Sequence, residues 1–180
     1  GHSQRVSDLS ASIARLAKYS AADIEFVRRG GLVHDIGKVS IPEKVLRKSD
    51  PLTPDEMHLI KLHPIFGASL LSRLPGMDTL VPVVLHHHER WDGSGYPGGL
   101  SMTDIPRESR VIAVADAYDA MTSNRPYGEV LSAEEALNEL RRCSGSQFEP
   151  SLVDAMHEAF LYGLLQPKAS MMYPRIEHRV

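Results

Sequence analysis

The sequence predicts an all-α fold in a single domain, and three observations support this prediction. Apolar residues recur at intervals of three and four along nearly the whole chain, which is the spacing of one face of an α-helix. No segment shows the alternation of apolar and polar residues that a half-buried strand has. The length of 180 residues favours one domain and is sufficient for a sizeable hydrophobic core.

The first two helices are expected near the N-terminus. Val6, Leu9 and Ile13 define the apolar face of the first helix. A second helix is expected over about residues 22–36, with Gly37 as its stop. Both helices should therefore bury one face against the rest of the domain.

The middle of the chain begins with a loop region over residues 40–51, which contains two prolines. The next helix should start at Thr53, because Thr53 can cap it and a proline and two acidic residues follow. It should end near His63. Pro64 marks the start of another helix, which should run to about Leu74.

Further helical segments are expected in the second half. Residues 80–89 carry a triple histidine, and residues 91–100 contain four glycines. Because glycine tolerates positive φ, this second segment should be a loop. A long apolar helix is expected over about 105–121, and a capping-box spacing at 132–135 opens another. The last helix should cover about 150–162.

Composition excludes some classes of protein. The net charge of -3 argues against a general binder of nucleic-acid polymers, whose affinity depends on clustered Lys and Arg. No apolar run approaches the ~20 residues that span a bilayer, and the single Cys143 fits a reducing compartment. A cytoplasmic location is therefore expected.

The opening Gly1-His2-Ser3 resembles the middle of a motif, so we expect a domain over residues 1–165 of a longer protein, followed by a tail or linker over 166–180.

Histidines and aspartates at wide spacing are the main chemical signal. Neutral imidazole and carboxylate ligands suit divalent iron, manganese or zinc. A metal centre assembled by folding is therefore expected from among His2, His34, Asp35, His63, His86, His87, His88 and Asp116. The alternatives are that His34-Asp35 caps a helix end and that Asp116 is a buried structural carboxylate. His58, His157 and His178 are interpreted as ordinary surface or core residues.

Neighbouring residues suggest how a centre of this kind could act. Adjacent positions on a helix point about 100° apart, so Asp35 could bridge two metals while His34 holds one of them. Lys38 lies one turn beyond this pair, and Arg125 lies just beyond the helix that holds Asp116. Both could hold phosphate oxygens, and the alternative for both is ordinary solvated charge.

Several segments resemble the motifs of one family. His34-Asp35-Ile36-Gly37-Lys38 resembles the core motif of the HD-domain metal phosphohydrolases, and Gly93-Ser94-Gly95-Tyr96-Pro97 resembles the second motif of their HD-GYP subfamily. Other segments that resemble HD-GYP motifs occur in the family's order, at residues 1–6, 63–64, 87–93, 114–120 and 122–127. The resemblance runs from residue 1 to about 163, and the ordered set of motifs makes it specific.

This resemblance implies an HD-type helical bundle with a metal centre and a glycine-rich loop. The family is bacterial and hydrolyses the second messenger cyclic di-GMP to pGpG, and often to GMP, with two or three metal ions that are usually iron or manganese. The implied ligands are His2, His34, Asp35, His63, His87, His88 and Asp116, with Asp35 bridging two metals. His86 falls at a position that is not a ligand in the family.

The resemblance also implies catalytic roles, led by Asp35 and Lys38. The expected nucleophile is a hydroxide that bridges two metals and attacks a phosphorus in line, so that the 3′ oxygen leaves. Lys38 and Arg125 would hold phosphate, and Lys38 could also help the leaving oxygen. Asp119 resembles a residue that lies behind the metal ligands.

The loop at Gly95, Tyr96 and Pro97 has two interpretations. In the family it is implicated in contacts with diguanylate cyclase domains. The alternative is that its glycines shape the wall beside the metals. By resemblance to the family, a regulatory domain is expected before residue 1. The helical content permits a homodimer without specifying one.

Two departures from the family leave alternatives open. Some members with three metals have a glutamate four residues before the first histidine, a position that would precede residue 1. Gly128-Glu129 stands where a basic residue often occurs, which would weaken substrate binding or change the preferred ligand. The leading hypothesis is a metal-dependent cyclic di-GMP phosphodiesterase. The alternatives are a cyclic-dinucleotide receptor or scaffold that acts through protein partners, and an HD phosphohydrolase of another nucleotide.

Overall fold

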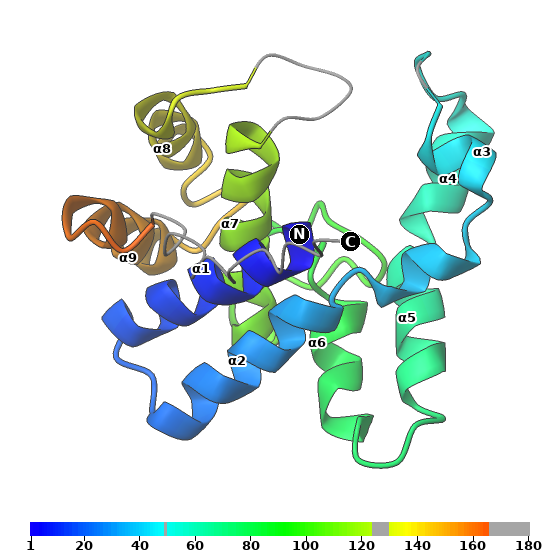
Figure 1. Cartoon of the computed structure of the whole chain (residues 1–180), viewed down its shortest axis with the longest axis horizontal. Helices are drawn as coiled ribbons and strands as arrows, with labels where there is room; N and C mark the ends of the chain where they lie inside the picture. The colour runs from blue at the N-terminus through cyan, green and yellow to red at the C-terminus, as the bar shows by residue number, and fades with distance from the viewer. Residues whose placement is uncertain (49, 124–129, 166–180) are drawn as a thin grey trace, which may run out of the picture.

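The computed structural model describes residues 1–48, 50–123 and 130–165, and this part of the chain contains helices and no strand (Figure 1). The α-helices are α1 (His2–Leu16), α2 (Ala21–Val33), α3 (Glu43–Leu46), α4 (Pro54–Lys61), α5 (His63–Leu71), α6 (Val81–Leu85), α7 (Arg107–Thr122), α8 (Ala133–Arg142) and α9 (Pro150–Leu161). Short 3-10 helices are η1 (Ile36–Ser40), η2 (Asp78–Leu80) and η3 (Met102–Asp104). The predicted all-α fold is confirmed. The predictions for Arg125, Gly128-Glu129 and the tail lie outside the described residues.

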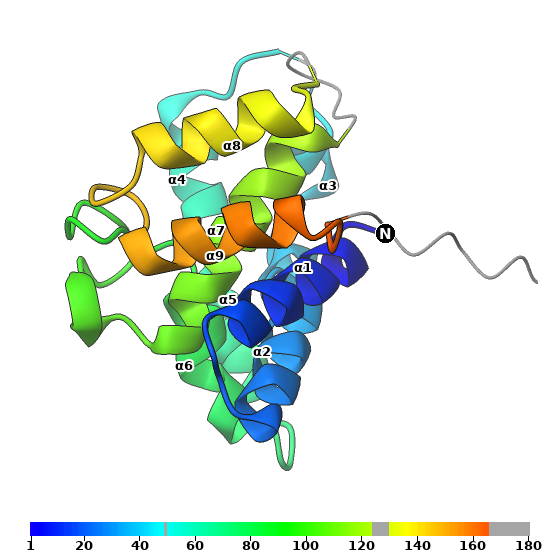
Figure 2. The same ribbon diagram turned by 90° about the vertical axis from the view of Figure 1, so that its left-hand side faces the viewer.

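Helix α7 runs through the middle of the molecule (Figure 1). Helices α1 and α2 pack against it, while α8 and α9 lie beside each other over another part of it (Figure 2). These five helices share the main hydrophobic core, whose buried side chains include Val6, Ile13, Val27, Val111, Ile112, Val114, Leu137, Leu140, Leu152 and Met156. Removal of these apolar surfaces from water is the main force that fixes the helices around α7.

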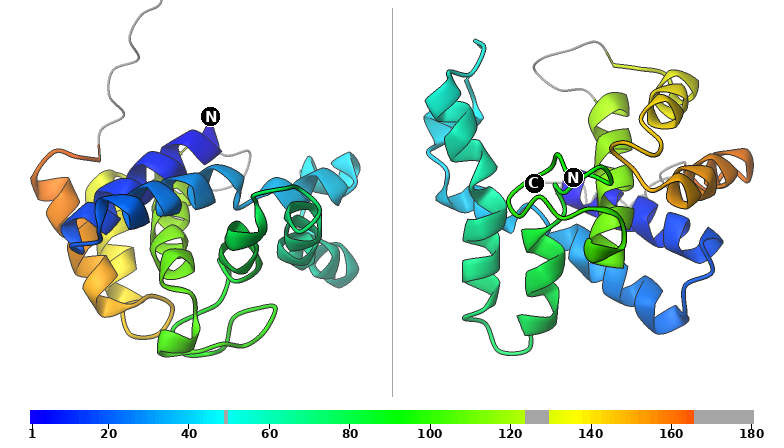
Figure 3. Two further views of the ribbon diagram at one scale, coloured as in Figure 1. Left: turned by 90° about the horizontal axis from the view of Figure 1, so that it is seen from below. Right: turned by 180° about the vertical axis from the view of Figure 1, so that it is seen from behind.

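A smaller core joins α5, η2 and α6 through the buried side chains of Leu71, Leu80 and Val84. Figure 3 shows α5 and α6 as a pair, with the long green connection to α7 beside them. Helix α6 also contacts α2 and α7. The smaller core therefore holds α5 and α6 together next to the main bundle.

Helices α1 and α2 approach closely because small residues meet at their contact. A Cβ on Gly31 would lie 2.8 Å from the Cα of Ser7, and the Ser7 hydroxyl donates a 2.7 Å hydrogen bond to the carbonyl oxygen of Arg28. This approach brings His2, at the start of α1, to the end of α2, where its ring centroid lies 5.3 Å from that of His34.

The second helix ends earlier than predicted, at Val33 instead of about Ile36. Asp35 has φ -96° and ψ 8° and leaves the helix, and a 3-10 helix follows. Gly37 lies inside this 3-10 helix and is not the helix stop. A Cβ there would lie 1.9 Å from the carbonyl oxygen of His63, so glycine is required for the close approach of η1 to α5.

Two other predictions need correction, while the helix starts are confirmed. The expected loop over residues 40–51 contains the short helix α3. The histidines at 86–88 follow α6, which ends at Leu85. Thr53 caps α4, since its hydroxyl accepts from the Glu56 N–H while its own N–H donates to the Glu56 carboxylate. The same arrangement at Ser132 starts α8.

Candidate metal centre

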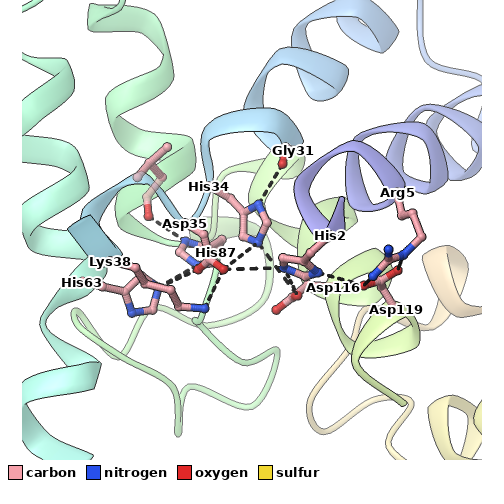
Figure 4. Close-up of polar contacts among 11 residues, drawn as sticks. His2, Arg5, Gly31, His34, Asp35, Lys38, His63, His87, Asp116 and Asp119 are labelled. Atoms are coloured by element: carbon pink, nitrogen blue, oxygen red, sulfur yellow. Dashed lines mark hydrogen bonds and ion pairs between the residues drawn. The ribbon is translucent and has the colours of Figure 1, made fainter. Parts of the chain in front are cut away.

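The packing brings seven of the predicted site residues together from five places in the chain, and Figure 4 labels all of them except His88. They come from the start of α1, the exit of α2, the start of α5, the turn after α6 and the middle of α7: His2, His34, Asp35, His63, His87, His88 and Asp116. His34, His63 and His87 are fully buried. These side chains lie where the main and the smaller core meet.

Asp35 belongs to two groups of potential metal ligands. One group contains His2, His34 and Asp35, and the other contains Asp35, His63, His87 and His88. The Oδ2 atom of Asp35 lies 3.5 Å from His2 Nε2 and 3.6 Å from His34 Nε2. Its Oδ1 atom lies 3.2 Å from His63 Nε2 and 4.0 Å from His87 Nε2. Each carboxylate oxygen therefore faces one set of histidines.

Three of these histidines are oriented in the same way. The Nδ1 atoms of His34, His63 and His87 lie 2.8, 2.8 and 2.7 Å from the carbonyl oxygen three residues earlier in the chain. A carbonyl oxygen can only accept, so each Nδ1 carries the hydrogen. Each Nε2 therefore presents a lone pair toward the centre, which is the tautomer that a metal ligand needs.

These lone pairs face other acceptors. The buried Nε2 of His34 has no hydrogen-bond donor among the described residues, and its near polar neighbours are oxygens of Asp35 and of Asp116, the latter at 3.8 Å. The Nε2 atoms of His63 and His87 are 3.2 Å apart. Acceptors that face one another in a buried site repel unless a cation lies between them. The donor set therefore fits divalent metal ions.

His2 is oriented by a carboxylate. Its Nδ1 lies 2.8 Å from Oδ2 of Asp119, and Arg5 binds Asp119 with both Nε and Nη2, at 2.5 and 3.0 Å. Hydrogen bonds to Asp119 and Asp35 raise the pKa of His2 to about 9. Asp119, predicted from the family's motif, contacts a candidate ligand from behind. The role of Arg5 was missed by the sequence analysis, although Arg5 belongs to the first motif.

Charges around the centre keep the carboxylate ionised and two histidines neutral. Burial raises the pKa of Asp35, but the hydrogen bond from His2 and the nearby ammonium of Lys38 outweigh burial and hold that pKa far below its usual range. Burial lowers the pKa of His88 to about 3, and burial also lowers the pKa of His87. Neutral imidazoles and an anionic carboxylate are the forms that bind metal.

Asp116 and Lys38 both lie at the centre. Oδ1 of Asp116 is 3.4 Å from His2 Nε2 and 3.8 Å from His34 Nε2, so Asp116 adds a second carboxylate beside these two histidines. Nζ of Lys38 is 2.5 Å from Oδ2 of Asp35, while the Lys38 side chain is 41% exposed. Lys38 can therefore reach both the centre and a ligand that approaches from solvent.

The glycine-rich loop forms one wall of the centre. The Tyr96 ring stacks on the His88 ring, with 4.9 Å between centroids and 25° between planes. Lys61 lies 5.4 Å from the centroid of Tyr96. His86 points to Glu89 at 3.3 Å, which agrees with the prediction that it is not a metal ligand. Gly95 and Pro97 flank Tyr96 in this wall.

The fold and the site define an all-α protein with a histidine and aspartate centre suited to metal ions. The sequence profile of the HD domain family matches residues 1–152, and the chain belongs to this family. The HD-GYP assignment predicted from the motifs is confirmed by the relatives described in the next paragraph. Among the described helices, none has the length and the apolar composition that a bilayer crossing requires.

Known proteins of this family include close relatives. A cyclic di-GMP phosphodiesterase of Thermotoga maritima is 41% identical over 156 residues, which cover 86% of this chain and 42% of the relative. A 3'3'-cGAMP-specific phosphodiesterase of Vibrio cholerae is 34% identical over 159 residues, covering 87% of this chain and 30% of the relative. The solved structure of a HDG"Y"P protein from Bdellovibrio bacteriovorus superposes with a TM-score of 0.71 at 22% identity, over 89% of this chain and 51% of that one. The chain spans less than half the length of these curated relatives.

Proposed function

We propose that this chain is a metal-dependent phosphodiesterase that hydrolyses cyclic di-GMP to pGpG, and an assay for GMP would decide whether hydrolysis continues. The observation that carries this proposal is the arrangement of Asp35, whose two oxygens face two separate sets of histidine lone pairs. This arrangement supports two divalent ions, both of which Asp35 would contact. The mixture of imidazole and carboxylate ligands suits iron, manganese or zinc, and the family resemblance favours iron or manganese. Relatives named for this activity support the choice of substrate.

The proposed ligands divide between the two positions. His2, His34 and Asp116 would hold one ion, while His63, His87 and His88 would hold the other, and Asp35 would contact both. Ions at such a centre supply a water nucleophile that is activated near neutral pH and neutralise charge on phosphoryl oxygens. A third ion, expected in some members of the family, has no ligand set of its own among the described residues.

The chain's own residues would bind and orient the phosphodiester. Lys38 is half-exposed and adjoins Asp35, so its ammonium can bind a phosphate oxygen next to the reacting phosphorus and stabilise charge on the leaving 3′ oxygen. We propose Arg125 as a second phosphate ligand on the basis of its motif. Asp119, held by Arg5, would fix the ring of His2 so that Nε2 faces the centre.

Purification without oxygen, metal analysis and an assay that follows pGpG and GMP would test the proposal. Two metals per chain together with product formation would support it. A chain that binds two metals and cyclic di-GMP but forms no product would contradict the enzyme and favour the receptor or scaffold.

A second candidate is a phosphodiesterase of another cyclic dinucleotide. The similarity to relatives named as 3'3'-cGAMP-specific favours this candidate over other nucleotides. A comparison of kcat/KM for cyclic di-GMP, 3'3'-cGAMP and a linear dinucleotide would separate the two.

The loop around Tyr96 supports a role as a wall of the site, because the Tyr96 ring packs inward on His88. Contacts with diguanylate cyclase domains, a homodimer and an upstream regulatory domain stay predictions.

A further inference from the structure

Glu89 is a buried carboxylate that the proposed mechanism does not use. Its side chain has no exposed surface, and it directly follows His88, a proposed metal ligand. Oε1 accepts a 2.6 Å hydrogen bond from the N–H of Gly98, and Oε2 accepts a 3.2 Å bond from the N–H of Leu100. Nδ1 of His86 lies 3.3 Å from Oε1. A buried carboxylate is costly without such partners, and here most of them belong to the glycine-rich loop.

The loop is folded directly over Glu89. A Cβ on Gly95 would lie 2.4 Å from the backbone nitrogen of Arg90 and 2.5 Å from the Cα of Glu89. The N–H of Tyr96 donates a 3.2 Å hydrogen bond to the carbonyl oxygen of His88. The loop therefore has little freedom to shift as long as the Glu89 carboxylate holds its far end.

His88 depends on this loop more than the other candidate ligands do. The rings of His34, His63 and His87 are oriented by carbonyl oxygens, and that of His2 by Asp119. For the ring of His88, the described residues supply no hydrogen bond. Its ring is held by packing, between the rings of His87 and His63 and the stacked ring of Tyr96.

We infer that Glu89 is a positioning residue, which holds Tyr96 through the 95–100 loop and thereby fixes the ring of His88 for metal binding. The inference rests on the proposed metal centre. It also gives His86 a role, since His86 contacts Glu89 and not the centre. Glu89 should affect the ion held by His63, His87 and His88 and leave the ion held by His2 and His34 in place.

Mn2+ titration of the whole chain with Glu89→Gln tests the inference. Gln is nearly the same size, but it has one acceptor oxygen, and its NH2 group, which only donates, cannot replace the second oxygen that accepts from the loop. We expect affinity at one of two positions to fall by about tenfold or more, as for other groups that orient a metal ligand. Electron paramagnetic resonance of the Glu89→Gln variant should then show a single Mn2+ ion, where the wild type shows a coupled pair. Trp91 is the only tryptophan, so a change in its fluorescence should report a shift of the loop.

Ser94→Ala is the matched control. Ser94 accepts from Arg90 and donates to Asp92 in the outer turn of the same loop, at 2.8 and 2.6 Å. This variant should bind both ions with wild-type affinity. Tyr96→Leu should reproduce the Glu89→Gln defect, whereas Tyr96→Phe, which keeps the ring, should not. The two Tyr96 variants test the inference even if Glu89→Gln reduces the amount of folded protein.

A double-mutant cycle separates positioning from general destabilisation. If Glu89 acts through His88, Glu89→Gln should cause no further loss in a His88→Ala background. Additive losses, or unchanged affinity at both positions in Glu89→Gln, would overturn the inference while the metal centre stands. Failure of the wild type to bind Mn2+ would instead overturn the proposed centre itself.

Discussion

At the scale of single residues, the negative charge that faces the histidine lone pairs comes from the carboxylates of Asp35 and Asp116. Asp35 faces both sets of histidines and Asp116 faces only His2 and His34. Asp35 is therefore the carboxylate that lies between the Nε2 lone pairs of His63 and His87 and those of His2 and His34. Loss of Asp35 should affect both proposed ions, while loss of Asp116 should affect one.

Asp35→Ala should abolish metal binding at both positions and reduce hydrolysis by more than about a hundredfold, because the bridging carboxylate is lost. Metal analysis and circular dichroism would check this, since helical content should be largely unchanged. Asp154→Ala, which removes an exposed aspartate of α9, is the control. Full activity in a metal-free Asp35→Ala variant would refute the mechanism.

Lys38→Ala should retain both ions and impair turnover. Nζ of Lys38 binds the Oδ2 atom that faces His2 and His34, so its removal frees a ligand oxygen and does not remove one. The loss of a cation at the phosphate should lower kcat/KM by about a hundredfold. Lys44→Ala, an exposed lysine of α3, should behave as the wild type. A loss of metal from Lys38→Ala would contradict this role.

At the scale of elements, η1 matters because it presses the Asp35 segment against the start of α5. A Cβ on Gly37 would lie 1.9 Å from the carbonyl oxygen of His63 and 2.5 Å from the backbone nitrogen of Gly67. Both contacts are with backbone, which cannot rotate away. The distance between Asp35 and His63 therefore depends on the absence of a side chain at Gly37.

Gly37→Ala should destabilise the fold by at least about 2 kcal/mol, because backbone must shift to admit the methyl group. Urea unfolding would measure this loss. The variant should also bind metal more weakly, since the shift separates Asp35 from His63. Ser69→Ala on the exposed side of α5 is the control, and a Gly37→Ala variant of normal stability would show that η1 can move freely.

At the scale of the whole molecule, the centre joins helices that line two neighbouring cores. Helices α1, α2 and α7 line the main core and α5 lines the smaller one, while α6 contributes Val83 to the main core and Val84 to the smaller one. Ions held by both sets would bind only when the two parts are folded together. Metal binding should therefore be coupled to the stability of the entire fold.

Saturation with Mn2+ should raise the melting temperature, and EDTA should reverse the change. One ion at about a hundredfold excess over its Kd adds about 2.7 kcal/mol, which corresponds to roughly 5–10 °C for a chain of this size. Thermal unfolding followed by circular dichroism would measure the shift. Asp35→Ala in the same Mn2+ solution should show none. An unchanged melting temperature in a protein shown to hold two ions would contradict the coupling.

Much of the fold could be predicted because its signals are local. Apolar spacing indicated the helices, and the capping residues Thr53 and Ser132 marked two starts correctly. The end of α2 was misplaced because Asp35 leaves the helix to meet residues far away in the sequence. Gly37 was interpreted as a stop for the same reason, since its close neighbour His63 is not visible from local pattern.

The sequence by itself determined the helical class, the family and the set of histidines and aspartates, because these depend on composition, spacing and motif order. Only the tertiary structure decided which oxygen of Asp35 faces which histidines, how Arg5 and Asp119 orient His2 and what Glu89 holds. His2 and Asp119 are separated by 117 positions in the chain. Contacts over such distances depend on how the cores pack the helices, and no local pattern encodes them.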